Sequence, residues 1–376
     1  MIPLFRTAVA PGTAERVTAV VDSGRFGHGP AVEEFERAVG DRVGNPRVAA
    51  VNNGTSGLHL ALRLAGAYAG APGVPGGPGE VLSTPFTFEA TNWSILANGM
   101  RLTWVDVDPA TLNIDLDDLA KKITPATRAI MVVHWAGFPV DLVRLARILD
   151  DAEAEHGFRP VVVEDCAQAW GATCAGRPLG GHGNLCVFSF HATKHLSCGG
   201  GGLLTLPDEE SLLRARRLRF FGIDRDADRV NADYDVAEWG YNFYMNEINA
   251  AIGLANLETV DERVRLHRLN AAFYDAELAG VAGLELTARP EGLESSFWLY
   301  PVKVDDRASF MRKMAGAGVT VSVVCRRNDE HGCVADARTP LPGVDAVHDR
   351  VVNIPVGWWL TPEERSHIAE TIKSGW

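Results

Sequence analysis

One acid and one lysine stand out because each follows an apolar run. Asp165 ends the run VVVED, and Lys194 comes after the next apolar run and the hydroxyls of Ser189 and Thr193. In α/β sheets, ligands bind at the carboxyl ends of the strands, so both side chains are expected at that edge. A lysine amine forms Schiff bases with carbonyl compounds, pyridoxal phosphate (PLP) included.

An acid beside a pyridine nitrogen keeps that nitrogen protonated and makes the ring an electron sink. Asp165 and Lys194 are therefore candidate catalytic residues of a PLP enzyme. The alternative for this pair is structural: Asp165 caps a turn, and Lys194 pairs with a surface acid. Lysine usage favours the first interpretation, because Lys194 is the only lysine between Lys122 and Lys303 in a chain with 36 basic residues. Arginine cannot supply a nucleophilic amine.

Two further segments could hold parts of such a cofactor. Gly54, Thr55 and Ser56 follow an expected strand and open an expected helix, where free backbone N–H groups bind phosphate. The alternative is ordinary helix capping by Thr55 or Ser56. Phe88 follows the next strand and could stack on a cofactor ring, or it could pack in the core.

The elements that must position these residues alternate between β-rich and helical runs over the first 250 residues, which indicates βαβ units around a mostly parallel sheet. The expected strands are Arg47–Val51, Glu80–Ser83, Arg101–Val107, Ala129–His134, Pro160–Glu164, Leu185–Phe190 and Gly202–Leu206. The expected helices are Pro30–Val39, Ser56–Ala65, Phe88–Asn98, Asp115–Lys122, Leu142–His156 and Glu209–Phe220. Polar or Gly/Pro-rich stretches at 67–79 and 222–240 are expected loops.

The remainder of the chain is expected to form a smaller α+β domain. A helical run extends from about Met245 to Leu278 and is followed by mixed elements. These are an expected strand, a helix, a strand and a final helix at Ser295–Val304, Arg307–Ala317, Val319–Val324 and Thr361–Ser374. We therefore predict a large domain over 1–255 and a small domain over 256–376.

Composition excludes several classes of protein. The chain has 376 residues, 46% hydrophobic and 22% charged, which is ordinary for a globular protein. A net charge of -12 argues against a general nucleic-acid binder, and no run approaches a membrane span. The start, MIPLFRTAVAPGT, lacks the layout of a signal peptide, so we expect a cytoplasmic protein with reduced thiols. Six cysteines without a CxxC pair favour buried or incidental thiols over zinc, and we predict no metal.

In its motifs the chain resembles the DegT/DnrJ/EryC1/StrS family of PLP-dependent sugar aminotransferases, which have the aspartate-aminotransferase fold (fold type I). The resemblance covers nearly the whole chain, and the combination of EDCAQ with FSFHATK is highly specific. Its other segments are GRFGHGPAVEEFE, NNGTSGLHLAL, TPFTFEAT, VDVDPATLNID, VHWAGFPVDL, WGYNFYMNEINAAIGLANL and NIPVGWWLTPEE.

The resemblance implies a role for each matching residue. Lys194 matches the Schiff-base lysine, Asp165 the acid at the pyridine nitrogen, and Gln168 the side chain near the ring hydroxyl. Phe88 matches the stacked aromatic and Ser189 a hydroxyl partner of the phosphate. Thr55, together with the backbone of Gly54 and Ser56, matches the phosphate cradle. Asn242 matches an asparagine that reaches the phosphate from the neighbouring subunit, which implies a homodimer with shared active sites.

Substrate residues are less well marked. Candidates are Phe26 and His28 near the start, and a set in CRRNDEHGCV, where many members of the family carry a histidine-bearing segment that approaches the sugar: Arg326, Arg327, Asn328 and His331. A surface turn is the alternative for RRND. The loop at 67–79 is longer than is usual in the family, and paired glycines follow Ser197 and Cys198 without the usual acid. We assign no firm role to His134, which could be a hydrogen-bonded core histidine.

The resemblance predicts transfer of an amino group from L-glutamate or L-glutamine to a keto sugar. A nucleotide-linked 3- or 4-keto-6-deoxy sugar, in an antibiotic or surface-glycan pathway, is favoured, and a keto-cyclitol of the inosose type is the alternative. Related dehydratases carry histidine at the lysine position, so Lys194 favours transamination. A non-catalytic PLP-binding regulator stays as a second class, and a purely structural oligomer does not explain the residues that would bind the cofactor.

Overall fold

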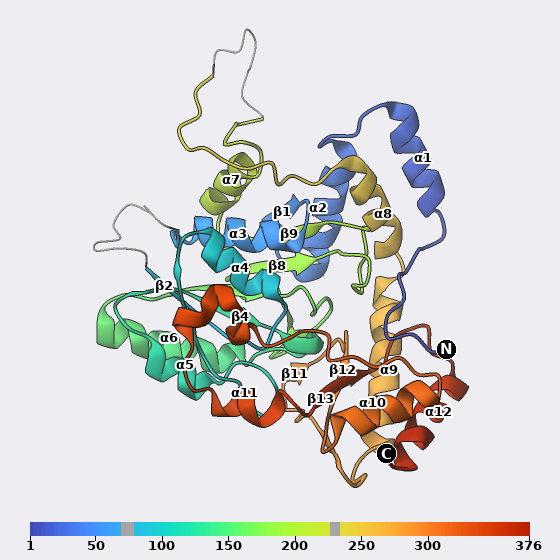
Figure 1. Ribbon diagram of the computed structural model, residues 1–376. Coiled ribbons are helices and arrows are strands. Elements are labelled where there is room, and N and C mark those ends of the chain that lie inside the picture. The colour runs from blue at the N-terminus through green and yellow to red at the C-terminus, as the bar shows by residue number, and fades with distance from the viewer. Residues whose placement is uncertain (69–78, 226–233) are drawn as a thin grey trace.

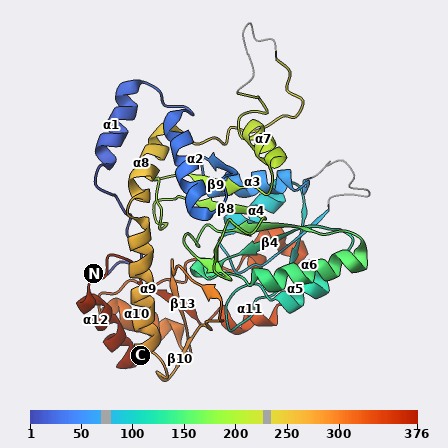
Figure 2. The same cartoon turned by 180° about the vertical axis from the view of Figure 1, so that it is seen from behind.

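The computed structural model describes residues 1–68, 79–225 and 234–376. Most of the loop expected at 67–79, and residues 226–233 of the loop expected at 222–240, lie outside the described residues. Helices and strands form a larger layered body with a smaller one below it in Figure 1. The two ends of the chain lie close together beside α12 (Pro362–Lys373), as Figures 1 and 2 both show.

The larger body is built on a seven-stranded sheet in the order β1-β9-β8-β5-β4-β2-β3. Its neighbours are parallel except around β9, which is antiparallel to both β1 and β8. The mostly parallel sheet expected from the sequence is thus present with one reversed strand. The bounds are β1 Val48–Val51, β2 Glu80–Ser83, β3 Arg101–Trp104, β4 Thr127–Val133, β5 Val161–Asp165, β8 Leu185–Ser189 and β9 Gly202–Thr205.

Helices cover both faces of this sheet. Alternate side chains of each strand point to opposite faces, so each strand contributes to two cores. In β4, Ile130 and Val132 join the core beneath one helical layer, and Ala129 and Met131 join the other. The first layer contains α2 (Pro30–Val43), α5 (Leu116–Lys122), α6 (Leu142–His156) and α8 (Glu247–Leu257). The second contains α3 (Gly54–Leu64), α4 (Glu89–Ala97), α7 (Glu209–Leu218) and α11 (Pro342–Val347).

The smaller body has a core of its own. A three-stranded antiparallel sheet in the order β10-β12-β13 packs against helices of the C-terminal third and against Ile2. Its elements are β10 Leu284–Leu286, β12 Tyr300–Val304, β13 Val351–Ile354, α9 Val260–Glu277, α10 Arg307–Gly316 and α12. Helix α9 serves both bodies, with Val264 in the large core and Tyr274 in the small one. The domain boundary at 255/256 stays a prediction.

Short elements complete the described chain. A second three-stranded sheet joins β11 (Leu293–Glu294), β6 (Thr173–Cys174) and β7 (Arg177–Pro178), and α1 (Thr13–Ser23) packs along α8. The 3-10 helices are η1 Trp135–Gly137, η3 Asn328–Glu330 and η4 Gly332–Ala337.

Two expected elements differ in the structure. The strand expected at Val319–Val324 is absent from the described secondary structure; this segment makes two isolated bridges, Ile2 with Val319 and Ser322 with Asn353. Val324 has a φ of 72°, which ends the extended conformation. The single helix expected from Met245 to Leu278 is two helices, α8 and α9, that meet at Thr259 (φ -120°, ψ 0°).

The outer edge of the sheet is closed by a buried ion pair. Strand β1 pairs with β9 on one side; on its other side Val51 forms a bridge with Tyr244, and the remaining backbone groups of the strand need other partners. Glu36 accepts a hydrogen bond from the Ala50 N–H, and Arg219 donates to the Ala50 carbonyl. Glu36 and Arg219 also pair with each other, and both are buried.

Candidate active site

The expected catalytic residues lie at the carboxyl edge of the large sheet. Asp165 is the last residue of β5 and is in register with Val133 of β4 and Val187 of β8. Lys194 follows β8 by five residues, in a turn where its N–H donates to the carbonyl of His191. The charge of Asp165 acts on the Lys194 amine, so the two side chains share one environment.

Asp165 is a buried carboxylate with two hydrogen bonds. Its Oδ2 accepts the Thr91 hydroxyl at 2.7 Å, and its Oδ1 accepts the N–H of Ala167 at 3.0 Å. Burial raises the pKa of Asp165, while these bonds and the nearby Lys194 oppose that rise. The site would therefore favour a cation next to the carboxylate.

The Lys194 amine lies over an aromatic ring. Among the described residues its Nζ makes no hydrogen bond or ion pair, and it lies 3.4 Å from the centre of the Trp298 ring. Burial lowers the pKa of Lys194 to about 7, against opposing charges on Asp165 and Cys325. An amine with that pKa is partly neutral at physiological pH, as a nucleophile or a general base must be.

The start of α3 forms a tight cradle against the end of β8. Asn53 is the N-cap: its side chain accepts the Ser56 N–H at 2.8 Å, so neither Thr55 nor Ser56 is the cap. A Cβ on Gly54 would lie 3.0 Å from the Cβ of Ser189, and one on Gly202 would lie 2.8 Å from the Asn53 backbone. Glycine at both positions lets the helix start approach Ser189. In the described contacts the N–H groups of Gly54 and Thr55 keep no partner.

Two more expected cofactor residues are Gln168 and Phe88. Gln168 is buried, and its Oε1 accepts the Ala136 N–H at 2.7 Å, which leaves its amide NH₂ as the available donor. Ala136 has a φ of 56°, so the backbone there is strained. Phe88 precedes α4 and is 56% exposed, so its ring is not core packing.

Asn242 lies next to the cradle through its backbone. Its carbonyl accepts the Asn52 side chain at 3.2 Å, and the Phe243 carbonyl accepts the Asn52 N–H at 2.7 Å. The side chain of Asn242 is exposed.

The structure does not bring Phe26 and His28 to the catalytic pair. Phe26 is 48% exposed and its carbonyl accepts the N–H of Glu247. His28 accepts a hydrogen bond from Arg219 at 3.0 Å, beside the edge strand β1. Burial and the charge of Arg219 lower the pKa of His28 to about 4, so it is a neutral acceptor there.

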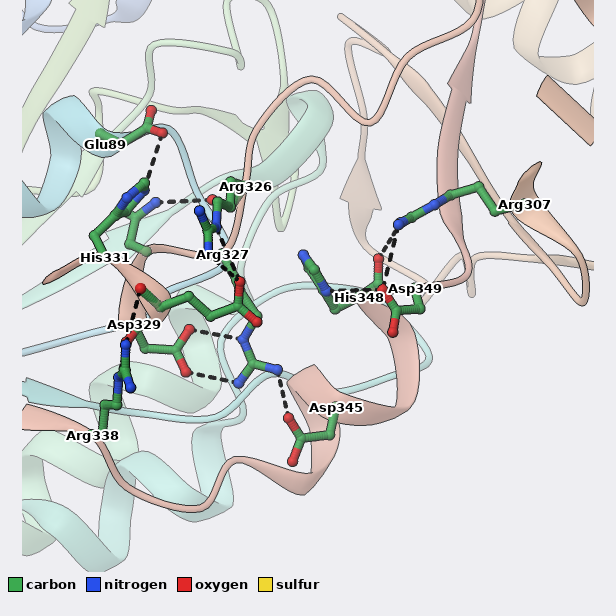
Figure 3. A network of polar contacts seen from close by, with 12 residues as sticks. Glu89, Arg307, Arg326, Arg327, Asp329, His331, Arg338, Asp345, His348 and Asp349 are labelled. Carbon is green, nitrogen blue, oxygen red and sulfur yellow. Dashed lines mark hydrogen bonds and ion pairs between the residues drawn. The ribbon is translucent and has the colours of Figure 1, made fainter. Parts of the chain in front are cut away.

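The segment Arg326–His331 is held by its own charges, as Figure 3 shows. Arg326 pairs with Glu330, and Arg327 makes a bidentate pair with Asp329 and a further pair with Asp345. These contacts occupy both guanidinium groups, so the structure supports a role for them in holding the segment. A substrate role for Arg326 and Arg327 stays a prediction.

His331 lies closer to the catalytic residues. Its Nε2 is 3.5 Å from Oε1 of Glu89, the residue after Phe88, and its ring meets the edge of Trp93. Asn328 attaches the segment to α4: it accepts from the Asn92 side chain at 2.7 Å and donates to the Thr87 carbonyl at 2.9 Å. Asn328 is completely buried, which rules out the surface-turn alternative for this residue.

Several residues of this site were missed in the sequence: Thr91, Glu89, Trp298 and Cys325. Cys325 lies among them, since the charges of both Glu89 and Lys194 act on its thiol, whose pKa burial raises. Thr91 and Glu89 belong to the segment TPFTFEATN, so that segment was the available signal. Trp298 and Cys325 come from the C-terminal third. Trp298 lies outside the segments that resemble the family, and Cys325 opens CRRNDEHGCV, in which only later residues were considered.

His134 is a hydrogen-bonded core histidine. Its Nδ1 accepts the Val140 N–H at 3.0 Å, so its Nε2 carries the proton and donates to Glu164 at 2.9 Å. Burial alone would raise the pKa of Glu164, but the bonds from His134 and Asn184 lower it. Cys166 lies within 4.8 Å of this pair, yet the hydrogen bonds already account for both side chains. Four of the six thiols are buried and all six are free.

A sheet edge with a lysine amine, a buried acid and a helix start defines an enzyme class, the PLP-dependent transferases of fold type I. The chain belongs to the DegT/DnrJ/EryC1/StrS aminotransferase family, whose model matches residues 9–373. The family, fold and enzyme class predicted from the sequence are thereby confirmed.

The chain is similar to solved structures over its whole length. AtS13 from Actinomadura melliaura is 64% identical, with a TM-score of 0.96 over 100% of this chain and 99% of that one. The sugar aminotransferase CalS13 from Micromonospora echinospora is 62% identical, with a TM-score of 0.96 over 100% of both chains.

More distant relatives bear on substrate and cofactor. GDP-perosamine synthase from Caulobacter vibrioides is 35% identical over 78% of this chain and 73% of its own length. The PLP-form of the putative sugar aminotransferase Spr1654 from Streptococcus pneumoniae is 25% identical, with a TM-score of 0.90 over 99% and 98% of the two chains. The predicted cofactor, PLP, is confirmed. No described helix is long and apolar enough to cross a membrane.

Proposed function

We propose that this enzyme transfers an amino group from L-glutamate or L-glutamine to a nucleotide-linked 3- or 4-keto-6-deoxy sugar, in antibiotic or surface-glycan biosynthesis. The observation that carries the proposal is the Lys194 amine, with a pKa lowered to about 7 at the same sheet edge as Asp165. A relative named for a GDP-linked amino sugar supports a nucleotide-linked acceptor.

The residues present fit PLP. A phosphate needs N–H donors, which the start of α3 offers beside Ser189, in a space that a Cβ at Gly54 would narrow. A pyridine nitrogen needs an acid, which Asp165 supplies. Phe88 has an exposed ring face for stacking, and Gln168 has a free amide donor for the ring hydroxyl.

When bound, PLP supplies the electron sink that takes up the electron pair of a broken C–H bond. Lys194 would hold the cofactor through its amine, and this amine would be free to act as a base once the amino donor is bound. Its Nζ then accepts the proton that leaves the donor's α carbon, holds it as ammonium, and returns it as a general acid. The bonds from Thr91 and Ala167 favour the ionised form of Asp165 against the effect of burial, and Gln168 is oriented by Ala136.

The acceptor is proposed to enter beside His331 and Glu89, on the side of the site formed by the C-terminal segment. Both side chains are partly exposed and offer hydrogen-bonding groups that suit sugar hydroxyls. Phe26 and His28 are not near this point in the single chain, and a substrate role for them would require a second subunit.

We also propose a homodimer in which Asn242 reaches the phosphate of the neighbouring active site. The exposed side chain of Asn242, held by its backbone to Asn52, supports this proposal. The location we propose is the cytoplasm. A keto-cyclitol acceptor of the inosose type is the alternative within the same reaction. A regulator that binds PLP without turnover is disfavoured by the presence of Lys194.

A panel of acceptors tests the substrate. The PLP-loaded protein is incubated with L-glutamate or L-glutamine and with dTDP-4-keto-6-deoxyglucose, its 3-keto isomer or scyllo-inosose, and the products are weighed by mass spectrometry. An amino sugar from either nucleotide substrate supports the proposal. An aminocyclitol alone would move the assignment to the keto-cyclitol alternative. If no acceptor is converted and neither amino donor bleaches the PLP absorption band, the regulator is favoured.

A further inference from the structure

We propose that Trp298 is a positioning residue for Lys194: its indole face holds the lysine amine whenever that amine is not bonded to the cofactor. The inference rests on the proposed role of Lys194 and deepens it. Nζ of Lys194 lies 3.4 Å from the centre of the Trp298 ring, and within the described ranges no acceptor competes for it. Trp298 is 7% exposed, so its ring meets the amine in a buried environment.

The indole is fixed in orientation by its own contacts. Its Nε1–H donates to the carbonyl of Thr193 at 2.9 Å, and Thr193 directly precedes Lys194. Phe5 stacks on the ring with a centroid distance of 5.1 Å and an interplanar angle of 26°. The hydrogen bond ties the ring to the backbone of the residue it serves, so ring and lysine keep their relative placement.

The backbone on either side of Trp298 is clamped to the cofactor region. Ser296 donates its N–H to the Gly137 carbonyl at 3.0 Å, and Leu299 donates to the Ala136 carbonyl at 3.2 Å. Phe297 has a φ of 50° and Ala136 a φ of 56°, so strained residues lie on both sides of this clamp. Such strain persists where the surrounding structure fixes it, and it clusters at functional sites.

An aromatic face suits an amine that must change its charge. It attracts an ammonium ion, yet it forms no directional bond that would hold the proton. A carboxylate at this place would trap Lys194 as a salt bridge. During transamination the amine takes the proton of the donor's α carbon, becomes ammonium over the ring, and gives the same proton back. The protein therefore gains no net proton, and no further reactant is needed.

The first test uses the full chain after removal of PLP. Reductive methylation with ¹³C-formaldehyde labels the six lysines and the N-terminus, and Lys194→Ala identifies the Lys194 signal. We expect the methyl protons on Lys194 to be shifted upfield by the indole ring current relative to the other lysines. The shift is lost in Trp298→Leu, is retained in part in Trp298→Phe, and is unchanged in Trp376→Phe, a control in the small body. An equal shift in Trp298→Leu would overturn the proposal.

The second test measures proton transfer in the loaded enzyme. Single-turnover reactions with L-glutamate and α-deuterated L-glutamate should be roughly ten- to hundredfold slower in Trp298→Leu, because a misplaced base loses its alignment. In Trp298→Leu the isotope effect should rise and the affinity for glutamate should be unchanged. Trp298→Phe should recover part of the rate. An unchanged rate and isotope effect contradict the proposal. If wild-type protein does not react with glutamate, the proposed donor fails, and the methyl resonance still decides the role of Trp298.

Discussion

The Thr91 hydroxyl donates to Oδ2 of Asp165 across 2.7 Å, and in turn lies 3.0 Å from the Thr87 hydroxyl. Because a carboxylate only accepts, Thr91 must be the donor to Asp165, so its oxygen is left to accept from Thr87. The chain of hydroxyls links the end of β5 to the start of α4, where Phe88 and Glu89 lie. One hydrogen-bond network thus links Asp165 to the segment that carries Phe88.

Thr91→Val should slow the glutamate half-reaction about ten- to a hundredfold, the range expected for a lost hydrogen bond to a charged group. The bond favours the ionised carboxylate, so its loss raises the pKa of Asp165 further. The acid limb of the pH–rate profile should then move to higher pH. Thr91→Ser keeps the hydroxyl and should restore the profile; a profile that is identical in Thr91→Val would refute this role.

The amine of Lys194 should react with added PLP in its neutral form. Its pKa is lowered from 10.5 to about 7 by burial, so the rate of recombination of PLP-free protein with PLP should level off near pH 7 instead of near pH 10. Stopped-flow absorbance measures this rate. A rate that keeps rising to pH 10 would show that the pKa of Lys194 is not lowered.

The same shift affects the stability of the PLP-free protein. Between pH 7 and 10.5 the unfolded chain holds a proton on Lys194 that the folded chain has lost, so this group's contribution to stability rises with pH across that window. In urea unfolding, the free energy of unfolding should depend less on pH in Lys194→Met than in wild type. Equal dependence in both proteins would contradict the lowered pKa.

Asn328→Ala should destabilise the protein by about 2–3 kcal/mol, because Asn92 loses a buried partner at 2.7 Å and the Thr87 carbonyl loses a donor. The urea midpoint measures the loss. The acceptor's KM should rise more than the donor's, since the segment that carries His331 is released from α4. Equal changes in both KM values would show that the segment does not face the acceptor.

Arg219→Leu should cost about 3–5 kcal/mol, because it leaves the buried charge of Glu36 without its buried partner and with only the more exposed Arg216 at 3.7 Å. The double variant Arg219→Leu with Glu36→Gln should lose less than the two single changes added together. Urea unfolding of the four proteins gives this comparison. Additive losses would mean that the two residues act separately.

The sequence was sufficient for the large sheet because its strands are apolar runs separated by helical periodicity. Runs such as AIMVV place alternate residues in two buried cores, and the strand is therefore apolar at every position. It was also sufficient to place Asp165 and Lys194 at one edge of the sheet, because residues at the ends of parallel strands share that edge; their roles stay a prediction. The reversed direction of β9 has no such local signature.

The C-terminal third was predicted less well because its short strands and bridges depend on distant partners. Val319 pairs with Ile2 and Ser322 with Asn353, so no local pattern defines a strand there. β10 and β13 were missed for the same reason, as both pair with β12. Trp298 and Asn328 reach the site through long-range contacts with Thr193 and Asn92 that sequence spacing does not reveal.

The most direct test of the central claim is the visible spectrum of the protein with PLP before and after L-glutamate, for wild type and Lys194→Ala. Wild type should show the absorption band of lysine-bound PLP, and glutamate should bleach it as the cofactor becomes pyridoxamine phosphate. Lys194→Ala should show neither change. A band of equal position and bleaching in Lys194→Ala would contradict the assignment of Lys194 as the residue that holds the cofactor.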